Sequence, residues 1–347
     1  MVVPPVQFSP APLERDVVLS PEWLTHILGV PVTSVTEVET LTTVATKIRF
    51  RVTYDGPSGD LPEALCVKAY LTEDGLRYAL TGQIEVGFYT QLAPLLDLRV
   101  PRCLHAAVDA DTGHGLVLMA DLVEEGARFL TALSPYSVDQ CAGTLEQLAK
   151  MHSVDVATTR PNDDRWLAPR LASYLGAMDE ERLQAQLDDG RAAMLAPENR
   201  DAARLRAAMA AVSERAATGP LCYVHCDAHA GNLYLDAAGQ PGLVDWQMVQ
   251  RGGWQLDVAY HLAAVLDVAD REQHEQSLLQ HYLDARAANG SPAPAFAEAW
   301  DLYRDALAYG FYLWAITYRV ERAVTERFVE RLGSAAEHHE SLQRLLG

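Results

Sequence analysis

Residues 221–246 read LCYVHCDAHAGNLYLDAAGQPGLVDW and contain the most informative pattern of the sequence. A short apolar run leads into His225, and Asp227 follows two residues later and Asn232 five residues after that. A second apolar run begins at once, and a third ends at Asp245. Short apolar runs separated by polar residues and glycine are typical of buried strands. The pattern therefore predicts a polar loop between strands, with Asp245 at a neighbouring strand end.

The spacing of these polar residues fits the requirements of phosphoryl transfer. The reaction needs a carboxylate that orients the acceptor hydroxyl and accepts its proton, and oxygen ligands for the magnesium ion that bridges the phosphates. Asp227 can supply the first, whereas Asn232 and Asp245 can supply the second. The residues thus predict an ATP-dependent kinase with Asp227 as catalytic base and Asn232 and Asp245 as Mg²⁺ ligands.

The sequence before this segment predicts a β-rich region with few helices. Ser20 and Pro21 are typical of a helix start, and Gly29 is typical of a helix end. Alternating and β-branched runs predict strands, and a longer apolar periodicity predicts one further helix. The predicted strands are Val35–Leu41, Thr46–Tyr54, Ala64–Leu71, Leu104–Val108 and Gly115–Met119, and the helix is Thr81–Leu96.

Beyond Asp121 the predicted structure is mainly helical. Apolar residues recur at helical spacing over Val138–His152, and the stretch from Pro161 to Gly219 predicts amphipathic helices. Strands are predicted at Leu221–Val224, Leu233–Leu235 and Gly242–Val244, and helices from Trp254 to the end. This order predicts an α+β protein with two lobes, residues 1–120 and residues 121–347.

The segment around Asp227 resembles the catalytic loop of the aminoglycoside phosphotransferase and choline kinase superfamily, which has a protein-kinase-like fold. His225, Asp227 and Asn232 match the loop, and Asp245 stands where that family has its metal-binding aspartate. The wording Asp-Trp-Gln at 245–247 is most similar to the bacterial choline-kinase-like or ecdysteroid-kinase-like branch. The resemblance implies a small β-sheet lobe that binds nucleotide and a large helical lobe that carries the catalytic loop and acceptor site.

The same resemblance implies roles for residues outside the loop. Lys68 stands where the family has a lysine that contacts the α- and β-phosphates, and Glu85 where a helix glutamate pairs with it. Ala120 and Leu122 flank the hinge whose backbone receives adenine in that family. Asp257 corresponds to an aspartate that braces the catalytic loop. The alternative for Lys68, taken alone, is a solvent-exposed side chain on an edge strand.

Two positions depart from the family pattern. Cys226 follows the loop histidine where the family usually has glycine, and the phosphate-covering loop Thr42–Thr46 contains no glycine. Hydroxyl and backbone N–H groups of this loop would have to take the place of a glycine-rich turn.

Two other classes of function remain open from the residues. A zinc-binding hydrolase could use Cys222, His225, Cys226 and His229, although no second Cys/His cluster occurs elsewhere in the sequence. The second class is a catalytically inactive nucleotide-binding module. It is disfavoured because the residues that catalysis would require are all present: Lys68, Asp227, Asn232 and Asp245.

Composition limits the kinds of binding partner and the cellular compartment that can be expected for the protein. The 347 residues carry a formal net charge of -19, which argues against a nucleic-acid partner and an anionic membrane surface. The first twelve residues lack a basic segment and a long apolar run, so no secretory signal is expected. Five scattered cysteines indicate a reducing, cytoplasmic setting. The expected acceptor is a small hydroxylated molecule: an aminoglycoside, a choline-like amino alcohol, a sugar, a sterol or a hydroxyacyl compound.

Overall fold

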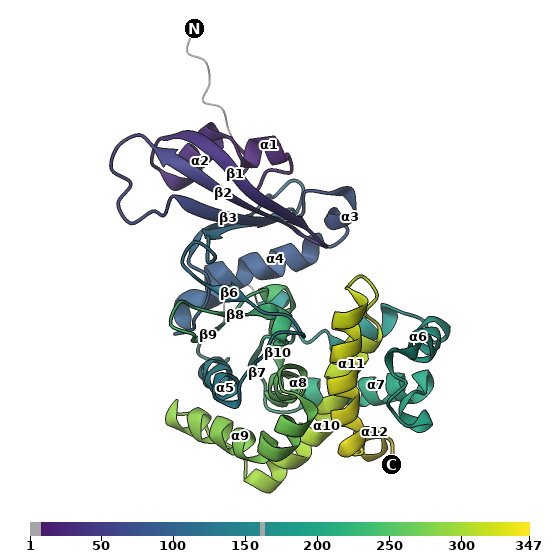
Figure 1. Ribbon diagram of the computed structural model, residues 1–347. Helices are drawn as coiled ribbons and strands as arrows, with labels where there is room; N and C mark the ends of the chain where they lie inside the picture. The colour runs from purple at the N-terminus through teal and green to yellow at the C-terminus, as the bar shows by residue number, and fades with distance from the viewer. Residues whose placement is uncertain (1–7, 160–163) are drawn as a thin grey trace. The chain divides into compact units, whose positions relative to one another are not determined.

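The chain folds into a β-rich unit and a mainly helical unit, seen in a computed structural model that describes residues 8–159 and 164–347 (Figure 1). The first unit extends up to Leu95 and also includes Val100–Ala127 and Asp245–Met248, and the second unit comprises the remaining residues. The α+β class predicted from the sequence is confirmed. Residues 1–7 of the segment inspected for a secretory signal, and residues 161–163 of the predicted helical stretch, lie outside the described residues.

The first unit begins with two short helices, α1 (Arg15–Val18) and α2 (Pro21–Leu28). The Ser20 hydroxyl caps α2 by accepting a hydrogen bond from the backbone N–H of Trp23. Gly29 ends the helix in the left-handed conformation, with φ of 71°, which a residue without Cβ adopts at little cost. Both predicted boundaries of this helix are confirmed.

Five antiparallel strands form the sheet of the first unit, in the order β1-β2-β3-β5-β4. All five strands were predicted, with end points within three residues of those observed. They are β1 (Val32–Thr42), β2 (Thr46–Tyr54), β3 (Ala64–Ala69), β4 (Cys103–Val108) and β5 (Gly115–Ala120). The loop without glycine, residues 43–45, is the tight connection of the β1–β2 hairpin, in which Thr43 N donates to Ala45 O.

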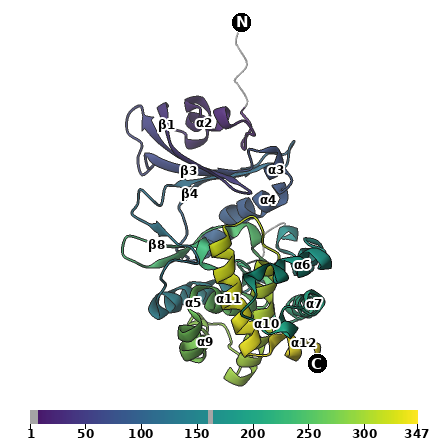
Figure 2. The same cartoon turned by 45° about the vertical axis from the view of Figure 1, so that its right-hand side comes forward.

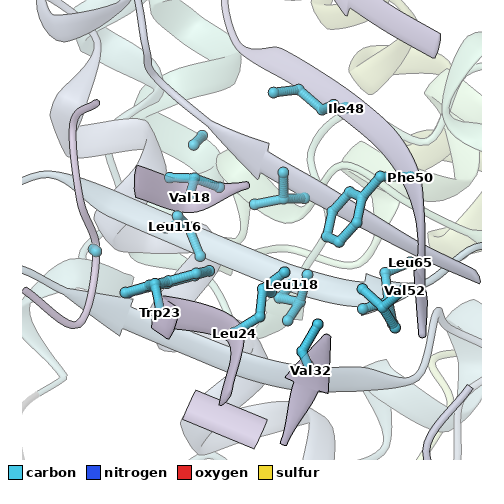
Figure 3. Close-up of a cluster of buried hydrophobic side chains, with 13 residues drawn as sticks. Val18, Trp23, Leu24, Val32, Ile48, Phe50, Val52, Leu65, Leu116 and Leu118 are labelled. Atoms are coloured by element: carbon cyan, nitrogen blue, oxygen red, sulfur yellow. The ribbon is translucent and has the colours of Figure 1, made fainter. Parts of the chain in front are cut away.

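Side chains alternate across this sheet and divide it into two functional faces. Leu65, Val67 and Ala69 of β3 join Trp23 and Leu24 of α2 in a buried apolar cluster (Figure 3). Because successive strand residues point to opposite faces, the intervening Lys68 points away from this cluster. One face of the sheet thus packs against α2 through apolar side chains, and the opposite face carries the buried side chain of Lys68.

A helix covers the face that carries Lys68. After the short helix α3 (Glu73–Leu76), α4 (Ala79–Gly87) continues as a π-helical turn, Phe88–Leu92, and a 3-10 turn, Ala93–Leu95. The helix predicted over Thr81–Leu96 is therefore found at the expected residues, but only its first part is a regular α-helix. A Cβ on Gly115 of β5 would lie 2.6 Å from the carbonyl carbon of Gly82. Backbone-to-backbone packing of two glycines sets the distance between α4 and the sheet.

The second unit consists largely of helices that pack on one another. The Ser137 hydroxyl and the Gln140 side chain form a reciprocal capping box that starts α5 at the predicted residue. Figures 1 and 2 show α10 and α11 side by side, and α10 also packs against α8 and α7. The helices are α5 (Val138–His152), α6 (Glu180–Gln186), α7 (Ala202–Thr218), α8 (Gln255–Val265), α9 (Val268–Ala288), α10 (Phe296–Ala315), α11 (Arg322–His338) and α12 (Ser341–Leu346).

Short strands in the second unit frame the segment 221–246. β7 (Cys222–Val224) pairs with β10 (Gln250–Gly252), and β8 (Leu233–Leu235) pairs with β9 (Pro241–Leu243) and β6 (Arg128–Phe129). The sequence predicted β7, β8 and β9 but missed the very short β6 and β10.

The stretch before β7 was predicted less well. Between residues 164 and 219 only α6 and α7 are α-helices, and the rest is 3-10 and π turns with connecting segments. Three- to six-residue turns have too few residues to display a helical periodicity, which is why the composition alone suggested longer helices. No helix among the described residues has the length and apolar character required to cross a membrane.

We predict that Gly115→Ala destabilises the first unit. The added methyl group would overlap the backbone of Gly82, and a backbone atom has no rotamer by which to move away. Overpacking of this kind typically costs about 1–3 kcal/mol, measurable as a lower urea midpoint. The control is Gly176→Ala, where an added Cβ meets nothing within 4 Å. Equal midpoints for the two variants would contradict the packing described for α4.

Candidate active site

The loop that follows β7 is held by one buried carboxylate. Oδ2 of Asp257 accepts the backbone N–H of His225 at 2.7 Å, and Oδ1 accepts that of Cys226, also at 2.7 Å. Asp257 lies in α8 and is completely buried. The bracing role that the resemblance implied for Asp257 is confirmed by these two bonds.

A histidine from α5 completes the surroundings of Asp257. Nε2 of His152 lies 3.0 Å from Oδ2 of Asp257, and Nδ1 lies 2.8 Å from the hydroxyl of Tyr282. A carboxylate accepts only, so Nε2 is the protonated nitrogen and the tyrosine hydroxyl donates to Nδ1. Burial lowers the pKa of His152 below its ordinary value. Burial would by itself raise the pKa of Asp257, but the hydrogen bonds from His152 and from the backbone N–H of His225 hold it below its ordinary value.

One face of α8 contacts three consecutive parts of the loop. Asp257 holds the backbone at residues 225 and 226, the Tyr260 hydroxyl donates to Oδ1 of Asp227, and Nδ1 of His261 donates to the carbonyl of Ala228. Positions i, i+3 and i+4 of a helix lie on one face, so a single helix can address the whole turn. Burial lowers the pKa of His261 to about 4, which keeps this histidine neutral.

Two residues of the segment adopt a left-handed backbone that is rare for side chains with Cβ. Cys226 has φ of 62° and Asp245 has φ of 68°. Such conformations cost of order 1–3 kcal/mol and persist only where the surroundings hold them. Cys226 stands at the position that is usually glycine in the resembling family, and its positive φ gives the physical reason for that preference. The hydroxyl of Tyr309, which donates to the Cys226 carbonyl at 2.6 Å, helps to hold this turn.

The loop histidine links the loop to the next strand. Nδ1 of His225 accepts the backbone N–H of Asp227 at 3.1 Å, so the proton resides on Nε2, which lies 3.1 Å from the carbonyl of Val244. Val244 N in turn donates to the carbonyl of Asn232. Asp245 is the next residue in the chain after Val244. His225 thus links the loop to the strand end that precedes Asp245.

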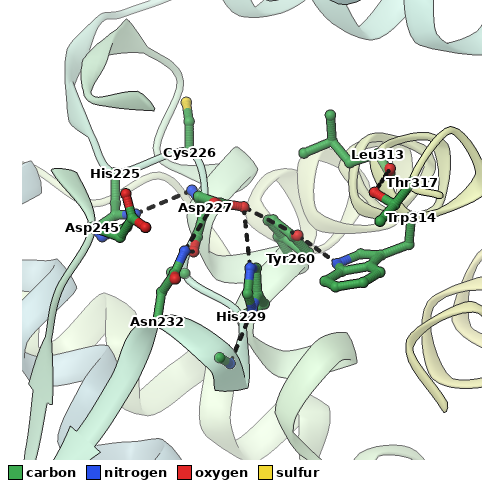
Figure 4. Close-up of polar contacts among 12 residues, drawn as sticks. His225, Cys226, Asp227, His229, Asn232, Asp245, Tyr260, Leu313, Trp314 and Thr317 are labelled. Atoms are coloured by element: carbon green, nitrogen blue, oxygen red, sulfur yellow. Dashed lines mark hydrogen bonds and ion pairs between the residues drawn. The ribbon is translucent and has the colours of Figure 1, made fainter. Parts of the chain in front are cut away.

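Asp227 carries the most elaborate set of contacts in the loop (Figure 4). Nδ2 of Asn232 donates both to Oδ2 of Asp227, at 2.8 Å, and to its backbone carbonyl, at 2.9 Å. The Tyr260 hydroxyl lies 3.3 Å from Oδ1, and Nε2 of His229 lies 3.5 Å from the same oxygen. The side chain of Asp227 nevertheless keeps 14% of its surface exposed. Asp227 is therefore an oriented carboxylate that a ligand can still reach.

The first unit contains a buried lysine paired with two carboxylates. Nζ of Lys68 lies 2.6 Å from Oε2 of Glu85 and 2.8 Å from Oδ1 of Asp245. Burial alone would lower the pKa of Lys68, but Asp245 and Glu85 raise it above its ordinary value, so the ammonium stays charged. The structure thereby excludes a solvent-exposed Lys68 and confirms its predicted pairing with Glu85.

Neighbouring groups fix this trio in place. Oε1 of Glu85 accepts the backbone N–H of Trp246 at 3.3 Å, and the Trp246 ring stacks on Phe88 with 3.7 Å between ring centroids. Trp246 is fully buried. At the predicted hinge, Ala120 ends β5 and Leu122 follows two residues later, both in the first unit.

The residues proposed for a zinc site do not gather. Within residues 8–159 and 164–347, one group of three His, Cys, Asp or Glu side chains has its ligand atoms within 4.8 Å of one another, and it lies elsewhere: Glu275, His338 and His339. The Cys222 thiol instead donates to the carbonyl of Gly252, and Cys226 Sγ accepts a hydrogen bond from Gln250. The described structure therefore offers no support for a zinc hydrolase at this loop.

Comparison with protein families identifies the chain. A profile of the phosphotransferase enzyme family matches residues 49–302. The chain belongs to the phosphotransferase enzyme family. The match includes Lys68, Glu85, the loop at 225–232 and Asp257. A search of curated proteins finds no match.

The fold of this phosphotransferase is similar to that of several solved structures. A candidate aminoglycoside phosphotransferase from Ralstonia eutropha JMP134 has a TM-score of 0.54 at 13% identity, with 93% of this chain and 96% of that chain covered. Choline kinase from Cryptosporidium parvum Iowa II has a TM-score of 0.53 at 10% identity, with 96% and 95% covered. Choline kinase LicA from Streptococcus pneumoniae has a TM-score of 0.50 at 16% identity, with 91% and 96% covered. The predicted superfamily and the kinase-like fold are confirmed.

Several contacts of the phosphotransferase loop were not predicted from its sequence. Tyr260 and His261 contact the loop from α8, and Tyr309 contacts it from α10. Tyr260 and His261 follow Asp257 in α8 by three and four residues. Residues at this spacing lie on the same face of a helix, so the bracing role expected of Asp257 could have indicated that these two side chains also contact the loop.

We predict that Asp257→Asn destabilises the phosphotransferase and lowers its turnover. Asparagine keeps one acceptor oxygen, but its NH₂ group would face the second of two buried backbone N–H groups. An unsatisfied buried donor costs about 1–3 kcal/mol, and more where a charged partner was lost. Urea unfolding should show a loss of about 3 kcal/mol. The control Asp284→Asn, at an exposed position of α9, should change stability by less than about 0.5 kcal/mol. Equal stability of the two variants would refute the bracing role.

Proposed function

We propose that this phosphotransferase is an ATP-dependent kinase that transfers the γ-phosphoryl group to a hydroxyl of a small molecule, with Asp227 as catalytic base. The proposal rests mainly on the setting of Asp227. Its carboxylate is reachable from solvent, yet Asn232 and Tyr260 fix both of its oxygens and Asp257 fixes the loop that presents it. A carboxylate so held can orient an acceptor hydroxyl and take its proton as the oxygen attacks phosphorus.

The donor set around the loop fits a magnesium ion. Both side-chain hydrogen bonds of Asn232 use Nδ2, so its side-chain oxygen is left without a hydrogen bond inside the described residues. Asp245 offers a carboxylate, and Mg²⁺ prefers such oxygen ligands. We propose that Asn232 and Asp245 together hold Mg²⁺, which when bound would neutralise charge on the phosphate oxygens. Asn232 is 7% exposed and Asp245 retains 15% of its side-chain surface.

The nucleotide is proposed to bind in the amino-terminal lobe, residues 1–120, and at the hinge that follows. Lys68 would contact the α- and β-phosphates, and Glu85 would keep its ammonium group in place, as the 2.6 Å ion pair supports. The backbone at Ala120 and Leu122 would receive adenine. Lys68 is charged and its position is set by two carboxylates, so it can align phosphates without reorganising.

The acceptor is proposed to bind in the carboxy-terminal lobe, residues 121–347, which presents Asp227. A screen of hydroxylated amino alcohols, aminoglycosides, sugars, sterols and hydroxyacyl compounds, read as acceptor-dependent ADP release with Mg-ATP, tests the function. The net charge of -19 favours cationic acceptors within such a set. ADP release that no acceptor class increases would count against a small-molecule kinase.

Asp227→Asn is expected to lower turnover by about 10²–10⁴-fold, the usual contribution of a general base. Asparagine retains an oxygen for the bond from Asn232, so the loop and ATP affinity should be preserved. Turnover is measured with the acceptor found in the screen, and ATP affinity by calorimetry. Turnover above a tenth of the wild-type rate would remove Asp227 from this role.

Asp245→Asn is expected to weaken Mg²⁺-dependent ATP binding by about tenfold or more, because the variant replaces an anionic ligand by a neutral one. Asparagine tolerates a left-handed backbone and can still accept a bond from Lys68, so the fold should persist. Calorimetric titration with ATP, with and without Mg²⁺, measures the effect. Asp97→Ala, at an exposed site, is the control. Unchanged Mg-ATP affinity in Asp245→Asn would exclude Asp245 as a metal ligand.

A further inference from the structure

A directed chain of three side chains ends on the carboxylate of Asp227. Nε1 of Trp314 lies 2.7 Å from the hydroxyl oxygen of Tyr260, and that oxygen lies 3.3 Å from Oδ1 of Asp227 (Figure 4). Indole nitrogen can only donate, so Tyr260 accepts from Trp314. The single hydroxyl proton of Tyr260 is then directed to Asp227, which as a carboxylate can only accept.

The surroundings of Tyr260 keep this chain in one arrangement. Tyr260 is 1% exposed and lies edge-on to Tyr309, with 5.6 Å between ring centroids. Trp314 stacks on Phe328 of α11, with 3.9 Å between centroids. Burial raises the pKa of Tyr260 well above its ordinary value. The hydroxyl is therefore protonated and able to donate near neutral pH.

Each carboxylate oxygen of Asp227 thereby accepts a hydrogen bond from a different residue. Asn232 holds Oδ2 from within the loop, whereas Tyr260 holds Oδ1 from α8. Without the bond from Tyr260, Oδ1 would lose a donor whose position is set by α8 and α10, and the carboxylate could rotate more easily about its Cβ–Cγ bond. With both bonds, rotation of the carboxylate plane breaks one of them.

We propose that Tyr260 is a positioning residue of the phosphotransferase: by donating to Oδ1 of Asp227, with its own hydroxyl oriented by Trp314, it fixes the carboxylate in the plane that accepts the acceptor's proton. The inference rests on the proposed role of Asp227 as base. It assigns to α8 and α10 a part in the chemistry, in addition to their part in the core.

Tyr260→Phe tests the proposal, because it removes one hydroxyl and keeps the ring packed. Turnover with the screened acceptor should fall about tenfold, the size expected for one hydrogen bond to a charged group. KM for Mg-ATP should stay near the wild-type value. The urea midpoint should fall, because the buried indole N–H of Trp314 loses its acceptor, so turnover is expressed per folded molecule. Trp314→Phe should lower turnover in the same direction by a smaller factor, since it only releases the orientation of the Tyr260 hydroxyl.

The matched control is Tyr303→Phe on α10. Its hydroxyl donates to a buried carboxylate too, Oε2 of Glu275 at 2.8 Å, but has no part in the loop. This variant loses the same kind of bond, so it measures any effect on stability, and its turnover per folded molecule should equal that of the wild type. Equal loss of turnover in Tyr260→Phe and Tyr303→Phe would show a structural effect and overturn the proposal.

A double-mutant cycle separates positioning from a general effect on the fold. If Tyr260 acts through Asp227, Tyr260→Phe should cost the Asp227→Asn enzyme less than about twofold, because interacting residues are non-additive. The same tenfold loss in both backgrounds would contradict the proposal while leaving Asp227 as base intact. Full activity of Asp227→Asn alone would instead refute the proposed function itself.

Discussion

Two backbone N–H groups that donate to one buried carboxylate determine the conformation of the loop at residues 225–232. Asp257 is fully buried and would be strongly destabilising without partners, but its two oxygens receive the N–H groups of His225 and Cys226, and His152 adds a third donor. These bonds hold Cys226 in a left-handed conformation that its Cβ disfavours. The sharp turn that results directs the next residue, Asp227, out of the core.

The first unit uses the same physical principle with the opposite charge. Lys68 is almost wholly buried, and removal of its ammonium group from water is offset by Glu85 and Asp245 at 2.6 and 2.8 Å. Apolar residues of similar volume could fill this space at no such cost, so a buried ionic trio contributes little net stability. Its retention is better explained by a function, and a fixed cation beside the carboxylate proposed to hold Mg²⁺ suits phosphate chemistry.

Much of this arrangement could be predicted because it depends on local patterns. The alternation of apolar and polar residues predicted the strands, and Ser20 and Gly29 predicted the ends of α2. The spacing of Asp227 and Asn232 predicted the loop between strands. The remainder depends on contacts distant in sequence. Trp314 reaches the loop only through the packing of α10 on α8, and the short strand β10 exists only because β7 lies beside it. A single sequence contains no signal for such contacts beyond the helical spacing of Tyr260 and Asp257.

We propose that a hydroxyl oxygen, oriented by Asp227, attacks the γ-phosphorus of ATP directly. Phosphorus NMR of the reaction with the acceptor found by the screen tests it most directly. We expect a phosphate monoester on a hydroxyl oxygen of the acceptor, formed in equal amount to ADP and suppressed in Asp227→Asn. Inorganic phosphate as the only product, a phosphorus–nitrogen bond, or a phosphate retained covalently on the protein would contradict it.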